Sequence, residues 1–164
     1  MSPLHKSENV DQSKGKQVEK SDFLNQRLDF LLHAASRHVT RIFKSHLEEH
    51  DLTYTQYLVF LALNTESPSS VEEIGEKLYL DSGTLTPLLK RLEAKNFIRR
   101  IRALEDERKL DISLTDSGKK LRLILFNLSN EIYEQLSLGP SLQTINMLLS
   151  KLISIFQHNA AKDA

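Results

Sequence analysis

One short segment, DSGTLTPLLKRLE (residues 81–93), has the residue types and spacing expected of a helix that contacts nucleic acid. Its leucines recur three and four residues apart, which predicts a single buried stripe. Small side chains permit close approach to base edges, and lysine and arginine bind phosphate or guanine. The segment therefore predicts a helix that lies in the major groove of DNA. The face opposite the leucines carries Gly83, Thr84, Thr86, Pro87, Lys90, Arg91 and Ala94.

The start of this helix has features of its own. Asp81 or Ser82 can cap it, and its first N–H groups and small hydroxyls are expected to face phosphates and base edges. Pro87 falls after the first turn, where it removes the backbone hydrogen bond to the Gly83 carbonyl. An ordinary surface helix gains nothing from that local cost, which favours a helix shaped for close approach to DNA.

Positive charge is concentrated around this helix, although the whole chain has 22 basic and 22 acidic residues and a formal net charge of zero. Between Ser82 and Leu110, eight bases and four acids leave a local charge of +4. A surface that follows a phosphate backbone needs such an excess. The alternative is a solvated helix and hairpin held by salt bridges. The bases are Lys90, Arg91, Lys95, Arg99, Arg100, Arg102, Arg108 and Lys109, and the acids are Glu93, Glu105, Asp106 and Glu107.

The segment that follows, NFIRRIRALEDERKLDISLT (residues 96–115), predicts a β-hairpin. Isoleucines and leucines partly alternate with polar residues in two short runs, and the polar LEDER sequence forms the tip between them. Arg108 at that tip is placed to enter a narrow minor groove, where arginine is favoured. Asp106 is expected to brace the tip or to orient Arg108.

Two short helices are expected before the quoted one. Thr53 with Gln56, and Ser70 with Glu73, have the spacing of capping boxes. A pair of helices joined by a turn and followed by a hairpin makes a winged helix-turn-helix. The predicted fold class is therefore mainly α with a small β-hairpin, in which long N- and C-terminal helices flank the DNA-binding region.

Those flanking helices predict how the chain assembles. We expect a polar disordered tail at 1–20 and a single domain at 21–160. Within it, the winged helix-turn-helix spans about 53–114, and dimerisation helices span about 22–49 and 115–159. Their apolar surface exceeds what one small domain can bury, and one recognition helix reads only a few base pairs. The sequence therefore predicts a homodimer.

The composition excludes several classes of function. The chain has no cysteine, so it offers no disulfide, thiolate nucleophile or thiol redox switch. It shows no signal peptide and no segment of membrane-spanning length, so we expect a cytoplasmic protein without a membrane partner. No glycine-rich phosphate loop or nucleophile motif is present, which argues against an enzyme and against a cofactor.

These motifs together resemble the MarR family of bacterial winged-helix regulators, and more narrowly its organic-hydroperoxide regulators of the OhrR type. The resemblance runs from about residue 24 to 121 and is most specific in the quoted helix. It implies a homodimer with two wings that binds a pseudo-palindromic operator in double-stranded DNA, and family precedent favours repression. It is carried by LDFLLHAASR (28–37), LTYTQYLVFLAL (52–63), LYLDSGTLTPLLKRLE (78–93), EDER (105–108) and LTDSG (114–118).

The resemblance also assigns DNA-contacting residues by matching position. Six lie on the recognition helix and two on the wing, and the two wing residues form the expected pair at its tip. They are Ser82, Thr84, Thr86, Pro87, Lys90, Arg91, Asp106 and Arg108.

The sequence departs from the OhrR-type group where that group senses peroxide. Its reactive cysteine falls at Asp29, and the two tyrosines that bond the cysteine fall at His33 and Phe43. Sensing by oxidation of the protein's own thiol is therefore not expected. Asp29 and His33 lie four residues apart and share a helix face, so we hypothesise an ion pair that holds the DNA-competent form or responds to another effector.

Three alternatives remain open from the sequence. In the first, the Asp29–His33 pair is incidental, since such helix pairs contribute only about 0.2–0.5 kcal/mol. The same pair, or His46 with His50, has the spacing of metal ligands, although no tight ligand cluster is evident and no metal site is predicted. In the third alternative, the winged helix serves only for contacts with another protein.

Overall fold

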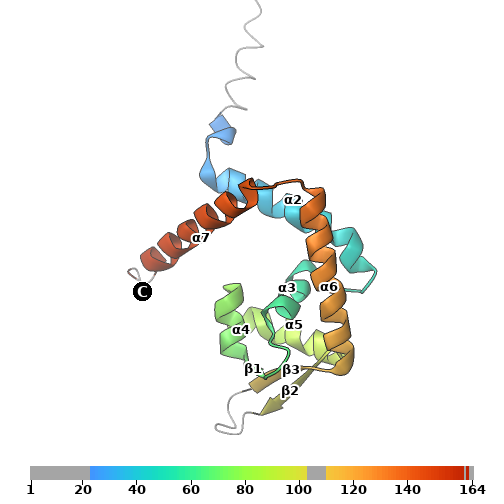
Figure 1. Cartoon of the computed structure of the whole chain (residues 1–164). Helices are drawn as coiled ribbons and strands as arrows, with labels where there is room; N and C mark the ends of the chain where they lie inside the picture. The colour runs from blue at the N-terminus through green and yellow to red at the C-terminus, as the bar shows by residue number, and fades with distance from the viewer. Residues whose placement is uncertain (1–22, 103–109, 161, 163–164) are drawn as a thin grey trace, which may run out of the picture. The chain divides into compact units, whose positions relative to one another are not determined.

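The computed structural model describes residues 23–102, 110–160 and 162, so Asp106 and Arg108 lie outside the described residues. The predicted fold class is confirmed: helices dominate, and a small antiparallel sheet accompanies them (Figure 1). The elements are α2 (Leu28–Glu48), α3 (Tyr54–Ala62), β1 (Ser69–Ser70), α4 (Val71–Leu78), α5 (Ser82–Ala94), β2 (Ile98–Arg102), β3 (Leu110–Leu114), α6 (Asp116–Gln135) and α7 (Ser141–Ala160).

The chain divides after Ser45 into two compact units. Most of α2 belongs to the first unit, and all later elements belong to the second. In the second unit, α3 contacts α4, α5 and α6, and α5 also contacts β2 (Figure 1). The core of this unit is mainly aliphatic, with the aromatic rings of Tyr57 and Phe60 buried in it. It includes Phe60, Leu63, Ile74, Leu85, Leu89, Leu92, Ile98, Ile112 and Leu125, all at most 1% exposed.

Side-chain caps start α3 and α4 where the sequence predicts them, and a further cap starts α6. Thr53 and Gln56 form a complete capping box at α3, and Ser70 and Glu73 form another at α4. Thr115 caps α6 by accepting from the Gly118 amide. Each cap satisfies backbone N–H groups that have no partner inside the helix, which fixes where the helix begins.

Two cationic side chains bind the backbone carbonyls at the C-terminal end of α3. Arg122 Nε on α6 donates to the Phe60 carbonyl at 2.9 Å, and Lys77 Nζ on α4 donates to the Ala62 carbonyl at 3.2 Å. Carbonyls in the last turn of a helix have no partner within it and carry partial negative charge. The two side chains therefore join α3 to the helices on either side of it.

The sheet has three strands in the order β1–β3–β2, with both pairings antiparallel. The β2–β3 hairpin matches the predicted wing, and its register pairs Ile98 with Leu114 and Arg100 with Ile112. The two-residue strand β1 is an addition that the sequence analysis missed. Ser70 pairs with Asp111 there and also caps α4, so one residue serves both the sheet and the helix.

The start of α6 is fastened to the turn between α5 and β2. Thr115 Oγ1 and Ser117 Oγ both donate to the Asn96 carbonyl, at 2.7 and 2.6 Å. The Thr115 backbone amide donates to the Phe97 carbonyl. Gly118 permits this approach, because a Cβ at that position would lie 1.9 Å from the Phe97 carbonyl oxygen. Helix α6 is therefore held directly against the residues that follow α5.

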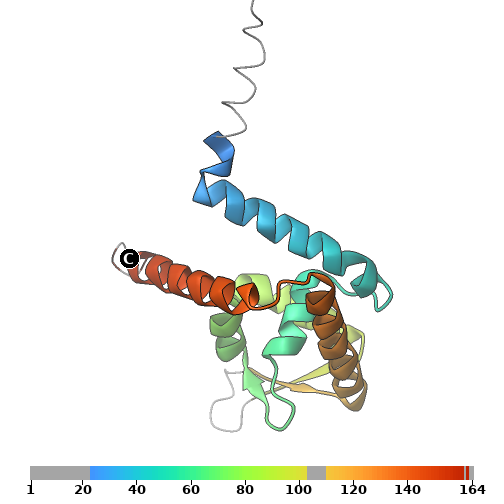
Figure 2. The same cartoon turned by 45° about the horizontal axis from the view of Figure 1, so that its top comes forward.

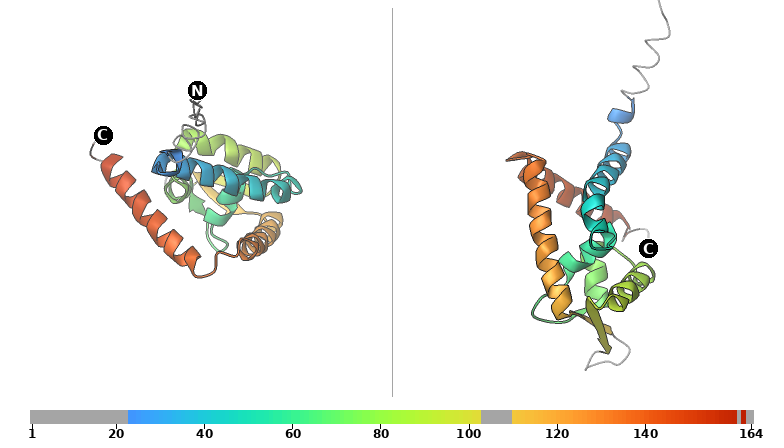
Figure 3. Two further views of the ribbon diagram at one scale, coloured as in Figure 1. Left: turned by 90° about the horizontal axis from the view of Figure 1, so that it is seen from above. Right: turned by 90° about the vertical axis from the view of Figure 1, so that its right-hand side faces the viewer.

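Helices α6 and α7 are two long helices joined by the short connection at 136–140 (Figure 3). None of the residues of α7 is buried, although it carries a regular apolar stripe. Several side chains of α6 are also exposed, including Leu123 at 62% and Phe126 at 52%. The described chain thus leaves much of the apolar surface of these helices uncovered.

The tight approach at Gly118 gives a prediction for stability. Gly118→Ala should lower the free energy of unfolding by about 3 kcal/mol, because the new methyl group overlaps a backbone carbonyl. Gly139→Ala is the control, since its Cβ would meet nothing within 4 Å. Its cost should be about 1 kcal/mol, from the positive φ. Urea unfolding followed by circular dichroism measures both, and equal losses would contradict the assigned contact.

Candidate nucleic-acid interface

Helix α5 presents the predicted polar face to solvent. The candidate residues on it, Ser82, Thr84, Thr86, Pro87, Lys90 and Arg91, are all exposed. Leu85, Leu89 and Leu92 are buried on the other side. The helix therefore has the two faces that the leucine spacing predicts, with its small and basic residues available to a ligand.

The cap of α5 is Asp81, one of the two residues predicted for it. Its carboxylate accepts from the Thr84 amide at 2.8 Å and from Thr84 Oγ1 at 2.9 Å. These bonds from Thr84, the amide first, hold the pKa of the Asp81 carboxyl below its ordinary value. The expectation of free N–H groups at this end is thus wrong for Thr84, whose amide already has a charged acceptor.

The threonine hydroxyls of α5 are also engaged within the helix. Thr84 Oγ1 donates to Asp81, and Thr86 Oγ1 donates to the Ser82 carbonyl at 2.7 Å. A hydroxyl has one hydrogen to donate and two lone pairs to accept with. Both oxygens therefore retain only lone pairs with which to bind a ligand, which suits base-edge amino groups better than phosphate oxygens.

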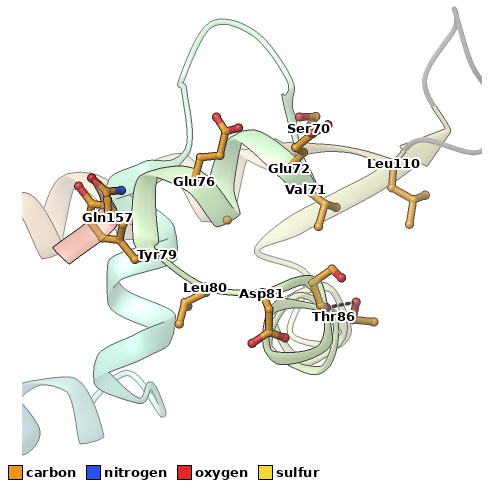
Figure 4. A pocket seen from close by; sticks show the side chains of 12 residues that line it. Ser70, Val71, Glu72, Glu76, Tyr79, Leu80, Asp81, Thr86, Leu110 and Gln157 are labelled. Carbon is orange, nitrogen blue, oxygen red and sulfur yellow. Dashed lines mark hydrogen bonds between the residues drawn. The ribbon is translucent and has the colours of Figure 1, made fainter. Parts of the chain in front are cut away.

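A cavity of about 1040 Å³ borders the N-terminal end of α5 (Figure 4). Its described lining includes the carboxylates of Glu72, Glu76 and Asp81, with Ser82 and Thr86 beside them and no lysine, arginine or histidine. Carboxylates in a shared hollow repel anions. We therefore expect phosphate to be bound further along α5, toward Lys90 and Arg91.

An ion pair joins the last turn of α5 to the wing. Glu93 accepts from Arg100 Nε at 2.6 Å and from the Arg100 amide at 3.2 Å, and Arg100 Nη2 lies 2.5 Å from the same carboxylate. Hydrogen bonding from Arg100 lowers the pKa of the Glu93 carboxyl. Arg100 contributes to the net charge of +4 between Ser82 and Leu110, but its side chain binds Glu93 and positions the hairpin.

A second ion pair holds the C-terminal end of α5. Lys95 Nζ lies 2.8 Å from Asp51 Oδ2 and also donates to the Asp51 carbonyl. Asp51 adopts a positive φ of 53° in the turn before α3. Lys95, like Arg100, is therefore committed within the protein, and the exposed bases on α5 itself are Lys90 and Arg91.

The hairpin extends from the body of the second unit beside α5, and Figure 2 shows both strands leading to the segment outside the described residues. A helix-turn-helix of α4 and α5 with a wing of β2 and β3 is the arrangement seen here. The model of the transcriptional regulator SarA/Rot family matches residues 41–125, more than half of the chain. The chain belongs to the SarA/Rot family of transcriptional regulators.

Curated relatives agree with this assignment. This SarA/Rot regulator is 42% identical over 117 residues to the HTH-type transcriptional regulator SarZ of Staphylococcus saprophyticus, covering 71% of this chain and 80% of that protein. It is 40% identical over 120 residues to SarZ of Staphylococcus haemolyticus, covering 73% and 82%. The narrower likeness to OhrR-type regulators remains an inference from the quoted motifs.

Solved structures show the same fold. Reduced AbfR bound to DNA is 34% identical, with a TM-score of 0.67 over 84% of this chain and 98% of that one. The apo form of wild-type MarR from E. coli is 24% identical, with a TM-score of 0.63 over 77% and 96%, and supports the fold alone. The SarA/Rot regulator therefore has the MarR-like winged-helix fold that the sequence resemblance implies.

The predicted sensor residues are not brought together as hypothesised. Asp29 accepts from Arg27 Nε at 3.1 Å and Nη2 at 3.2 Å, so the proposed ion pair between Asp29 and His33 is wrong in this structure. Hydrogen bonding from Arg27 also lowers the pKa of the Asp29 carboxyl. Phe43 is buried, at 1% exposed, whereas His33 lies on an exposed face of α2. Arg27, two residues before Asp29, is the closer partner that the four-residue spacing overlooked.

No three side chains of histidine, aspartate or glutamate in the described ranges gather as metal ligands would. Among the described helices, none has the length and hydropathy needed to span a bilayer.

The Glu93–Arg100 pair predicts a specific dependence of stability on pH. Because the folded protein holds the pKa of Glu93 below its ordinary value of 4.5, the pair stabilises the fold above that pH and loses this effect as the pH falls through the lowered pKa. Wild type should therefore exceed Glu93→Gln in unfolding free energy at pH 7, and the difference should shrink below about pH 4.5.

Glu66→Gln is the matched control, since Glu66 is exposed and its carboxylate has no ion-pair partner among the described residues. Urea unfolding at a series of pH values measures all three proteins. A difference between wild type and Glu93→Gln that stays constant with pH, or that Glu66→Gln reproduces, would refute the role given to the ion pair.

Proposed function

We propose that this chain is a sequence-specific regulator that binds a pseudo-palindromic operator in double-stranded DNA as a homodimer and represses transcription there. The observation that carries the proposal is the exposed face of α5, where small residues and the bases Lys90 and Arg91 lie side by side without an acid between them. The AbfR structure that resembles this chain is a complex with DNA, which supports the same partner here.

The wing, the β2–β3 hairpin, is proposed to contact DNA together with α5. The Glu93–Arg100 pair sets the base of the hairpin against α5, so that a ligand of α5 also meets the hairpin. We propose that Arg108 and Asp106, at the tip, act in the minor groove as the resemblance implies. Ser82, Thr84, Thr86 and Pro87 would then lie against the floor of the major groove, where low side chains permit approach.

The homodimer is supported by uncovered apolar surface. In α7, apolar residues recur at Ile145, Leu148, Leu149 and Phe156, the spacing of one helix face, and all four are exposed. Burial contributes about 25 cal/mol for each Å² of apolar surface removed from water. A second copy of the chain is the partner that also supplies the second recognition helix required for a pseudo-palindromic site.

We further propose that the protein regulates transcription without a redox-active thiol and without enzymatic activity. The sequence contains no cysteine, so peroxide cannot be sensed through oxidation of the protein's own thiol. We propose that the protein is not an enzyme, in keeping with its family of transcriptional regulators. An effector that acts through the region of Asp29, His33 and Phe43 remains the second candidate for control.

The DNA contacts can be tested on a duplex selected from a random pool by the wild-type protein. Arg91→Gln should weaken binding by about 1–3 kcal/mol if the guanidinium contacts a base. Lys90→Gln should lower the slope of log affinity against log salt by about 0.9, the value for one phosphate. Fluorescence anisotropy at several salt concentrations measures both effects.

Lys151→Gln, on the exposed side of α7, controls for the loss of one positive charge. A winged helix used for protein contacts would select no duplex, and its weak binding would respond equally to all three substitutions. Either result would exclude sequence-specific DNA binding through α5.

The dimer can be tested with two neighbouring residues of α7 that point in different directions. Leu148 belongs to the apolar stripe, whereas Met147 lies on the other side of the helix, and they are 58% and 63% exposed. Leu148→Glu should shift the protein from dimer to monomer in analytical ultracentrifugation, because it places a charge in the interface. Met147→Glu should leave the dimer intact, and a monomeric wild type would refute the proposal.

A further inference from the structure

Helix α2 carries a row of basic side chains along its middle, far from α5 in sequence. Residues 30–47 contain Arg37, Arg41 and Lys44, with three histidines, and the acids of the helix lie at its two ends, Asp29 in the first turn and Glu48 as the last residue. The middle of α2 is therefore basic, although the whole chain has equal numbers of acidic and basic residues. The DNA-binding role proposed for α5 and the wing leaves it unexplained.

The basic side chains share one face and border a common hollow. A groove of about 620 Å³ is lined entirely by residues of the first unit, so the site does not depend on any other element. We call this surface the α2 basic face. It is lined by Phe30, His33, Ala34, Ser36, Arg37, His38, Thr40, Arg41 and Lys44.

The two arginines of the α2 basic face have no acid to pair with. Arg37 and Arg41 are exposed, and neither forms an ion pair with a carboxylate in the described part of the chain. Arg27, just before the helix, shows the contrast, since Asp29 accepts two hydrogen bonds from it. Like charges four residues apart destabilise a helix by about 0.2–0.5 kcal/mol. An anionic ligand would offset that repulsion.

The linear arrangement of the basic side chains along α2 indicates which kind of anion fits them. From His33 to Lys44 the helix rises about 16 Å at 1.5 Å per residue, and the bases follow its axis instead of converging on one point. Over that length one DNA strand carries roughly five phosphates, at about 3.4 Å each. A row of cations of this length matches a polyanionic backbone better than a single small carboxylate or phosphate.

We propose that the α2 basic face binds the sugar-phosphate backbone of a DNA duplex, at a site separate from the recognition helix. Arg37 and Arg41 supply the principal contacts, with Lys44 and the two histidines at the margins. The contacts are electrostatic and carry no information on base sequence. Such a site adds affinity for DNA in general, or holds a second duplex segment while α5 occupies the first.

The test uses the full-length protein with α5 disabled by Lys90→Gln and Arg91→Gln. Binding of a labelled random-sequence duplex is measured by anisotropy across a series of salt concentrations. The parent variant should retain salt-dependent binding. Addition of Arg37→Gln and Arg41→Gln should lower the affinity at low salt at least about tenfold and the salt slope by about 1.8, the loss of two phosphate contacts.

A matched control removes two other exposed charges, Lys151→Gln and Lys162→Gln, from the same parent. It should stay within about twofold of the parent, since general charge affects binding weakly compared with direct contacts. The proposal is overturned if this control loses as much affinity as the arginine variant, or if the parent binds no duplex at low salt. Thermal unfolding by circular dichroism confirms that each variant is folded.

Two further measurements distinguish backbone binding by the α2 basic face from binding of a small anion and from sequence recognition by α5. Inorganic phosphate added at constant ionic strength should not displace the duplex from the parent, and displacement would assign the α2 basic face to a small free anion instead. In the otherwise wild-type protein, Arg37→Gln with Arg41→Gln should leave the preferred sequence of the selected duplex unchanged. Loss of that preference only on substitution of Lys90 and Arg91 keeps the roles of α2 and α5 distinct.

Discussion

Burial of the leucine stripe of α5 is the constraint on which the rest of the interface depends. The three inner leucines of this helix are at most 1% exposed, and each contributes roughly 2 kcal/mol by leaving water. Because side chains follow one another at about 100° around a helix, fixing this stripe also fixes the direction of Lys90 and Arg91. The polar face is therefore held outward by the core itself.

Acidic and basic residues have different tasks around that helix. Asp81 caps its start, Glu93 binds Arg100 in the wing, and Asp51 binds Lys95 at its end. Each carboxylate is used to position the helix, and each neutralises or blocks a group that would otherwise attract phosphate. The net charge of the segment therefore overstates what a ligand meets, and the usable cations lie along the middle of α5.

The sequence was most informative where structure is set by neighbours in the chain. Capping boxes and the leucine stripe depend on residues within a few positions of each other, and the hairpin joins two strands through one short polar tip; all three were predicted correctly. The ion pairs of Glu93 and Lys95 were not, because they join residues 7 and 44 positions apart through the packing of whole elements. Strand β1 was missed for the same reason, since two serines become a strand only when β3 lies beside them. Asp29 shows the reverse error, where helical spacing favoured His33 although Arg27 stood nearer.

The link between α5 and α6 explains why assembly and recognition would be coupled. The first residues of α6 are hydrogen-bonded to the Asn96 carbonyl, just after α5 ends, and Gly118 is packed against the next carbonyl. Helix α6 then carries exposed apolar side chains along its length. A dimer formed through α6 and α7 would therefore fix the separation of two α5 helices through a short and rigid connection. Any ligand that shifted α6 by a fraction of a helical turn would change that separation, and with it the match to two half-sites on DNA.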